Sequence, residues 1–196
     1  MHATVPGESD GDEALMLAYG SGDARAFEHL YARHKGPTYR YFLRHTSDRG
    51  AAEELHQDLW LRVVRSRARY RADARFATWL YTLARHRLVD HWRRNGGDRF
   101  ESVDEHDGDS ADAGDGFVAN ETLDPLRCAM NAETGARLLD ALAGVPAAQR
   151  DAFLLHVEAG LTLAEIAGLA GAPVETIKTR LRYAYRRLRA ALEDLR

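Results

Sequence analysis

A polar and acidic stretch near the middle of the chain limits what this sequence can fold into. From Asn95 to about Ala119 the residues are dense in Gly, Asp, Ser and Asn, so the segment has too few apolar groups to offset the entropy lost on ordering. A core that runs through all 196 residues is therefore not expected. We predict two small domains, residues 12–94 and 135–196, joined by a flexible acidic linker over 95–134.

Both predicted domains have the composition of helical structure. They lack alternating β-branched runs, and they are rich in Ala, Leu and Arg at helical spacing. No internal repeat is visible in the sequence. The predicted fold class is therefore all-α.

The formal net charge of −3 conceals an uneven distribution. Arg62–Arg94 carries ten Arg against two acidic residues, a balance of +8, and Lys178–Arg196 carries seven Lys or Arg against two acidic residues, a balance of +5. Between these blocks, Glu101–Gly135 carries ten acidic residues against one Arg, a balance of −9. Basic blocks on helices are typical of proteins that bind phosphate groups.

The C-terminal part contains the signals of two helices joined by a tight turn. Thr162-Leu163-Ala164-Glu165 is a capping box, which marks a helix start. Gly171 suits the left-handed conformation that ends a helix, and Pro173 suits the first turn of the next one. The predicted C-terminal domain therefore contains a helix-turn-helix.

The second of these helices is apolar on one side and basic on the other. Its predicted buried stripe consists of Ile177, Leu181, Ala184 and Leu188. Its opposite face carries Glu175, Thr179, Arg182, Tyr183, Arg186 and Arg189. Such a helix fits the major groove of DNA, where Arg binds guanine edges and phosphates. The alternative is a solvated basic face on an ordinary bundle helix, but the preceding capped helix and glycine turn favour DNA binding.

A predicted helix from about Ala52 to Arg69 has two apolar sides. One stripe consists of Ala52, Leu55, Leu59 and Val63, and a second set consists of Gln57, Trp60, Leu61 and Val64. A surface helix needs only one buried face. The second set either packs inside the domain or docks a partner protein, and the spacing alone leaves both open.

Aromatic residues alternate with arginines from Tyr70 to Tyr81. Unpaired bases bind to such a combination, because rings stack on them while arginines neutralise phosphates. The alternative is a set of core aromatics beside a solvated basic face. In the helix that follows, the predicted buried stripe is Leu80, Ala84, Leu88 and His91. Facing outward are Trp79, Thr82, Arg85, His86 and Arg93, and an outward Trp among arginines favours contact with single-stranded DNA.

Taken together, these residues resemble the extracytoplasmic function (ECF) group of bacterial sigma factors, the dissociable promoter-recognition subunits of RNA polymerase. The matching segments in chain order are Asp12–Met16 with Phe27–Tyr31, Ala52–Arg62, Tyr70–Leu80 and Val145–Leu181. Each motif is loose, but their order along the chain supports the resemblance.

The resemblance implies three sets of contact residues. Those for core RNA polymerase are Gln57, Asp58, Trp60, Leu61, Arg62 and Val64. Those for the −10 promoter element are Arg71, Ala72, Asp73, Ala74, Arg75, Phe76, Trp79, Arg85 and Arg93. Those for the −35 element are Thr176, Lys178, Thr179, Arg180, Arg182, Tyr183 and Arg186. The implied partners are core RNA polymerase, promoter DNA in double- and single-stranded form, and an anti-sigma factor.

Catalysis has little support in the sequence. The nine His are scattered, and His86 and His91 are five positions apart, which suits no shared metal on one helix face. No glycine-rich phosphate loop followed by Lys and Ser or Thr is present. We therefore expect no enzyme activity, metal, cofactor or small-molecule substrate.

The sequence also predicts a cytoplasmic location. Its apolar runs are far shorter than the roughly 20 residues that cross a bilayer, and Met1–Gly11 lacks the features of a secretory signal. The single cysteine, Cys128, fits a reducing compartment.

Two other classes of protein stay open at this point. A helix-turn-helix regulator that acts without polymerase should have a dimerisation helix or a ligand pocket, and the sequence signals neither. A polymerase-binding antagonist should have lost the arginine-aromatic segment and the basic helix, and both are present. The acidic residues from Glu101 to Asp124 are expected to form a disordered tether that screens the basic domains, or only a spacer.

Overall fold

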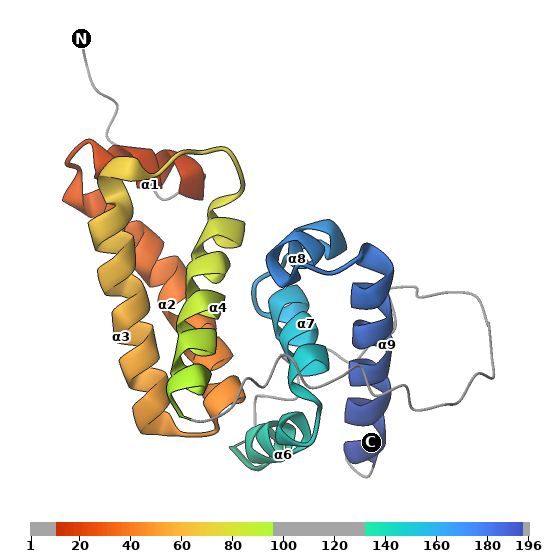
Figure 1. Ribbon diagram of the computed structural model, residues 1–196. Helices are drawn as coiled ribbons and strands as arrows, with labels where there is room; N and C mark the ends of the chain where they lie inside the picture. Colours follow the sequence, from red (N-terminus) through yellow and green to blue (C-terminus); the bar gives the residue numbers. More distant parts are fainter. Residues whose placement is uncertain (1–10, 96–131, 194–196) are drawn as a thin grey trace.

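The computed structural model describes residues 11–95 and 132–193, with side chains from 136 onward in the second range. Within these ranges all the regular structure is helical, which confirms the predicted all-α class. The N-terminal body consists of α1 (Asp12–Gly20), α2 (Ala24–Thr46), α3 (Arg49–Ser66), the short 3-10 helix η1 (Arg67–Arg69) and α4 (Phe76–Arg94). The C-terminal body consists of α6 (Ala132–Ala143), α7 (Ala147–Val157), α8 (Leu163–Ala170) and α9 (Val174–Ala191) (Figure 1).

Several predictions concern residues outside the described ranges. The acidic tether from Glu101 to Asp124 lies there, as do Cys128 and most of Met1–Gly11. The helix α6 begins at Ala132, so the last three residues of the predicted linker, 132–134, are helical.

In the N-terminal body, α1 lies across one end of α2, α3 and α4 (Figure 1). The core contains Leu15, Met16, Leu30, Tyr41, Phe42, Leu59, Phe76 and Leu80, all fully buried. The carboxylate of Glu13 accepts a hydrogen bond from the backbone N–H of Phe76 at 2.6 Å. This bond satisfies a free N–H at the start of α4, because the residue at the cap position, Arg75, offers no side-chain acceptor. The helix α1 therefore fixes where α4 begins.

Local signals set the ends of the other helices in this body. The Asp23 and Asp48 side chains accept hydrogen bonds from Arg25 N–H and Gly50 N–H and cap α2 and α3. At the end of α1, a Cβ on Gly20 would lie 2.8 Å from the carbonyl oxygen of Arg67. Glycine therefore allows α1 and η1 to approach closely.

The C-terminal body contains the predicted helix-turn-helix. Thr162 and Glu165 form the expected capping box: Thr162 N–H donates to Oε2 of Glu165 at 2.8 Å, and Glu165 N–H donates to Oγ1 of Thr162 at 3.3 Å. Gly171 ends α8 with φ of 64°, the left-handed conformation that the sequence predicts. Pro173 differs slightly from its predicted place, since it precedes the first turn of α9 as its cap residue.

The buried stripe of α4 differs from the predicted one at its end. Leu80, Ala84 and Leu88 are buried as expected, but Trp92 completes the stripe and His91 is only half-buried. Steps of four residues follow a single ridge of side chains along the helix. Trp92 at the end of this ridge packs edge-on against His45 of α2, with ring centroids 5.6 Å apart.

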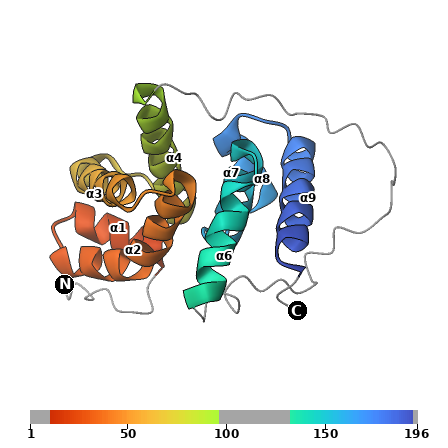
Figure 2. The ribbon, with the colours of Figure 1, turned by 90° about the horizontal axis from the view of Figure 1, so that it is seen from below.

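The two bodies pack against each other. The helix α2 contacts α6 and α7, while α4 contacts α8 (Figures 1 and 2). Figure 2 shows α6 and α7 on the side of the C-terminal body that faces α2. The sequence predicts two domains and a linker but gives no signal for this contact.

Candidate functional site

A groove opens on the N-terminal body between α2 and α3. It has a volume of about 660 Å³ and is lined by Phe27, Tyr31, Glu53, Glu54, His56, Gln57, Trp60, Leu61 and Val64. Aromatic and aliphatic side chains thus form its wall, and two carboxylates lie beside them. An exposed apolar groove with polar residues beside it is typical of a surface that binds another protein.

Trp60, which the resemblance implies to be a contact for core RNA polymerase, is buried in the wall of this groove. Its side chain is 6% exposed and packs edge-on against Phe27 and Tyr31, with ring centroids 5.8 and 4.9 Å away. Its indole N–H donates a hydrogen bond to Nε2 of His56 at 3.0 Å. Trp60 therefore packs within the domain, and its aromatic partners on α2 are what the sequence prediction missed.

The neighbouring side chain, Leu61, is 46% exposed. Gln57 and Arg62 are also exposed, while Asp58 and Val64 are half-buried. The spacing left two interpretations open, packing inside the domain and docking of a partner protein. Trp60 packs inside the domain, whereas Leu61, on the same helix, faces solvent. Phe27 and Tyr31 lie four residues apart on α2, a spacing that could have indicated the second wall of the groove.

The segment between η1 and α4 exposes Arg71, Ala72, Asp73, Ala74 and Arg75. Behind it lies a cluster of rings: Trp79 is half-buried and lies 5.0 Å from Tyr70 and 5.7 Å from Phe76 between ring centroids. Phe76 itself is fully buried, so it supports Trp79 and does not reach solvent. Burial raises the pKa of Tyr70 to about 12.

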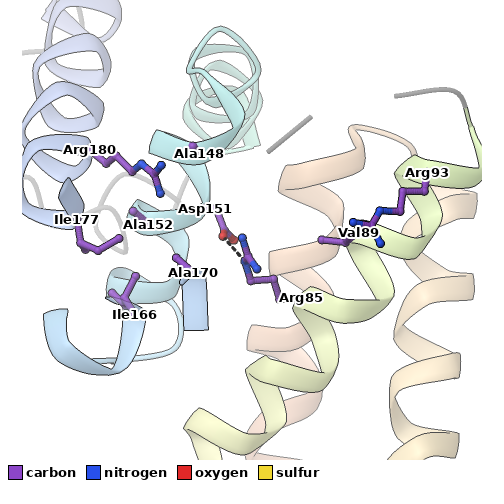
Figure 3. A pocket seen from close by; sticks show the side chains of 10 residues that line it. All are labelled: Arg85, Val89, Arg93, Ala148, Asp151, Ala152, Ile166, Ala170, Ile177 and Arg180. Atoms are coloured by element: carbon purple, nitrogen blue, oxygen red, sulfur yellow. Dashed lines mark hydrogen bonds and ion pairs between the residues drawn. The ribbon is translucent and has the colours of Figure 1, made fainter. Parts of the chain in front are cut away.

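The helix α4 follows this segment, and two of its arginines line a pocket between the two bodies. Figure 3 shows Arg85, Val89 and Arg93 of α4 opposite side chains of α7, α8 and α9. The space between them is a pocket of about 240 Å³. Two residues of the predicted outward face of α4, Arg85 and Arg93, therefore line an interdomain pocket, and Arg85 is 16% exposed.

The helix α9 presents the predicted basic face to solvent. Its apolar stripe of Ile177, Leu181, Ala184 and Leu188 is buried, as predicted. Exposed on the other side are Lys178, Thr179, Arg182 and Arg186, while Thr176 and Tyr183 are half-buried. Arg180 departs from this set, because it lines the interdomain pocket.

Tyr183 lies beneath two of these arginines. The guanidinium groups of Arg182 and Arg186 are 5.3 and 4.9 Å from the centre of its ring, within the range of cation–π attraction. This attraction favours positions of both guanidinium groups close to the ring. At the start of the same helix, Lys178 Nζ lies 2.7 Å from Oε1 of Glu175.

The described residues contain no group of three or more His, Cys, Asp or Glu that could hold a metal ion. No helix in the part of the chain that the structure describes is long and apolar enough to cross a membrane.

Comparisons with known proteins agree with the geometry. The family description "Sigma-70 region 2" matches residues 30–97, which include α3 and α4, and "Sigma-70, region 4" matches residues 135–188, which include α8 and most of α9. The ECF RNA polymerase sigma factor SigC of Mycobacterium tuberculosis is 30% identical over 168 residues, which cover 86% of this chain and 84% of SigC. SigL of the same organism is 33% identical over 196 residues, which cover 98% of this chain and 97% of SigL.

The chain belongs to the ECF sigma-factor family. This family consists of DNA-binding transcription regulators rather than enzymes.

Solved structures support the fold of this sigma factor. CnrH, in a structure with the cytosolic domain of CnrY, matches with a TM-score of 0.65 and 20% identity over 94% of this chain and 99% of CnrH. The sigma factor RpoE of Bartonella quintana, in a structure with the anti-sigma factor NepR, matches with a TM-score of 0.62 and 20% identity over 87% of this chain and 98% of RpoE.

Proposed function

We propose that this sigma factor binds core RNA polymerase, recognises the −10 and −35 promoter elements and promotes DNA opening at the start of transcription. The observation that carries the proposal is the exposed basic face of α9, which the capped helix α8 and the Gly171 turn hold out from the C-terminal body. A helix presented in this way is the part of a helix-turn-helix that enters the major groove.

At the −35 element, Arg182 and Arg186 contact bases in the groove. Their stacking on Tyr183 supports this role, because an ordered guanidinium loses less entropy when it binds a guanine edge. Lys178 near the start of α9 contacts phosphates, as do Thr176, Thr179 and Arg180.

At the −10 element, the exposed segment Arg71–Arg75 receives an unpaired base. Trp79, supported from behind by Tyr70 and Phe76, supplies a ring for stacking. Arg85 and Arg93 of α4 contact the backbone of the opened strand. This assignment requires the face of α4 to be accessible.

Core polymerase binds in the groove between α2 and α3. Leu61 lines the groove and is exposed, and Gln57, Asp58 and Arg62 lie within four positions of it on α3. The role of Trp60 is to hold the wall in place, and Val64 extends the apolar surface. An apolar residue among polar ones suits the centre of a protein interface.

An anti-sigma factor is a further proposed partner. The solved structures of RpoE and CnrH contain the anti-sigma factor NepR and the cytosolic domain of CnrY, respectively, which supports an inhibitor for this chain as well. We further propose that the protein acts in the cytoplasm with RNA polymerase, without catalytic activity of its own and without a cofactor.

Two measurements test the proposal together. Co-elution with purified core polymerase checks the first partner, and permanganate probing of the complex on promoters selected from a random library detects unpaired thymines. We expect the chain to co-elute with core polymerase, and we expect reactive thymines to appear only when the chain is present. If it binds duplex DNA equally with and without core and no thymines become reactive, it is instead a helix-turn-helix regulator that acts without polymerase.

A further inference from the structure

A histidine forms part of the wall of the groove between α2 and α3. His56 of α3 lines this groove together with Trp60, which lies four residues further along the same helix. Nε2 of His56 accepts a hydrogen bond from the Trp60 indole N–H at 3.0 Å. An indole N–H can only donate, so Nε2 carries no proton in this arrangement. The ring of His56 is therefore neutral, with its proton on Nδ1.

The surroundings of His56 favour this neutral ring. Burial lowers the pKa of His56, a hydrogen bond to the backbone of Lys35 raises it, and burial prevails, so that the pKa lies below its ordinary value of 6.5. The rings of Tyr31 and Tyr39 on α2 lie 6.4 and 5.8 Å from the imidazole, between ring centroids. The neutral form of His56 thus predominates at pH 7, and protonation becomes extensive only at a more acidic pH.

Other charged groups lie close to the groove. Glu53 and Glu54 of α3 line it, and their negative charge favours the protonated form of His56. Lys35 of α2 has the opposite effect, and its ammonium group lies 5.7 Å from the centre of the Tyr31 ring. Of the side-chain types around the groove, only imidazole has an ordinary pKa between pH 5 and 8. A change of the groove in this range is therefore expected to come from His56.

Protonation of His56 removes the acceptor for Trp60. An N–H on Nε2 would face the indole N–H at hydrogen-bond distance, and two donors cannot form a hydrogen bond with each other. One of the two rings must then turn. Trp60 packs edge-on against both Phe27 and Tyr31 in the groove wall, and Leu61, which is exposed in the groove, directly follows it in the chain. The protonation state of His56 therefore affects the wall beside the proposed docking residue.

We propose that neutral His56 is a positioning residue for core polymerase: it holds Trp60 in the groove wall, and protonation of His56 releases Trp60 and weakens docking. This inference rests on the proposed function, in which core polymerase binds this groove. If only the form with neutral His56 docks, the apparent affinity falls with the fraction of neutral molecules. The loss approaches about tenfold for each pH unit below the pKa of His56.

Nuclear magnetic resonance of the free full-length protein measures the titration directly. The ring C–H signals of His56, assigned by comparison with His56→Gln, should titrate with a midpoint below pH 6.5. The indole N–H signal of Trp60, assigned by comparison with Trp60→Phe, should shift with the same midpoint, because it loses its acceptor. The indole N–H signal of Trp79, whose ring neighbours are Tyr70 and Phe76, is the internal control. A Trp60 signal that stays unchanged while His56 titrates would overturn the inference.

Binding of core polymerase, measured from about pH 7.5 to about pH 5, tests the positioning role. The full-length protein carries a dye at its N-terminus. His56→Gln keeps a side-chain acceptor for Trp60 but does not titrate, so it should lose less affinity than the wild type as the pH falls. His56→Ala has no acceptor, so at pH 7.5 it should bind core about fivefold more weakly than the wild type, the equivalent of one lost hydrogen bond.

His29→Gln is the matched control, because it makes the same change at a histidine of α2 that does not line the groove. It should follow the pH profile of the wild type. Circular dichroism verifies that each variant keeps its helices over the pH range. Every variant retains Glu53 and Glu54 and meets the same polymerase, so the titration of those groups cancels when the variants are compared.

Two results of the binding experiment would contradict the inference. One is a parallel pH profile for the wild type and His56→Gln. The other is a folded His56→Ala variant that binds core as tightly as the wild type at pH 7.5. Failure of the wild type to bind core polymerase at pH 7.5 would instead overturn the proposed function.

Discussion

At the scale of single residues, adjacent side chains on α3 have opposite environments. Trp60 is buried against α2, whereas Leu61 next to it is 46% exposed. Exposure of a large aliphatic residue at the rim of an apolar groove is explained if a partner covers it. The same contrast separates the buried Phe76 from the half-buried Trp79 at the start of α4.

We expect Leu61→Asp to weaken binding of core polymerase by about 2 kcal/mol or more, because the interface would bury a charge. Circular dichroism and the thermal transition should change little, since the side chain is exposed. Leu17→Asp is the matched control, because Leu17 is 48% exposed on α1, away from the groove. If Leu61→Asp unfolds the protein, or if both variants bind core equally well, the docking surface is wrong.

The basic residues of α9 should divide into two classes. Arg186→Ala is expected to relax base preference at one −35 position at a cost of about 1 to 3 kcal/mol, because Arg186 contacts a base edge. Lys178→Ala should weaken binding to all sequences alike, because Lys178 contacts a phosphate. The slope of the logarithm of the binding constant against the logarithm of the salt concentration should become smaller in magnitude by about one. Binding selections on randomised −35 sites measure both effects, and the reverse pattern would show that the two assignments are exchanged.

At the scale of elements, the sequence predicts best where the signals are local. The capping box, Gly171 and the apolar stripe of α9 each depend on a few neighbouring residues, and all three have the predicted form. The environments of Trp60 and Arg85 depend on which helices pack together. Periodicity alone cannot show which helices pack together, so it left burial and exposure of Trp60 equally open and gave no signal for the Arg85–Asp151 pair.

The cap of α8 should contribute measurably to stability. Thr162→Ala removes the hydroxyl that accepts a hydrogen bond from Glu165 N–H, and the typical cost is about 1 kcal/mol of the free energy of unfolding. Denaturant unfolding of the full chain measures the loss. Thr179→Ala, at an exposed position within α9, should cost little, since Ala is the better helix former. Equal stability of the two variants would mean that the cap contributes nothing.

At the scale of the whole molecule, the sequence predicts two helical domains but not their contact. The interface uses residues far apart in the chain, such as Tyr41 with Asp151 and Thr78 with Glu165. Neither pair leaves a pattern that spacing or composition could reveal. The contact determines which of the proposed DNA-binding residues are accessible in the free protein.

Acid should open the interface. Burial raises the pKa of Glu165, but hydrogen bonds from Thr78 and Thr162 and the charge of Arg75 lower it to about 2, against an ordinary value of 4.5. A carboxylate with a lowered pKa in the contact between the two bodies stabilises that contact above its ordinary pKa, and the stabilisation is lost as the pH falls through the lowered value. We expect energy transfer between dyes on Ala68→Cys and Ala190→Cys, at exposed positions of the two bodies in a Cys128→Ser background, to fall as the pH decreases from about 4.5 to about 2.

Circular dichroism in the same titration separates domain opening from loss of helix. A Glu165→Gln variant should show a smaller response to pH, because it lacks the carboxylate that titrates. A response of equal size in this variant would assign the opening to other groups.

Run-off transcription with purified core polymerase and a library of promoter fragments tests the central claim most directly. The account predicts that this chain directs initiation at fragments that share a −10 and a −35 element. It also predicts that Leu61→Asp abolishes the transcripts by loss of core binding and that Trp79→Ala reduces them by impaired opening. Transcript levels no higher than those of core polymerase alone, from folded wild-type protein, would contradict the account.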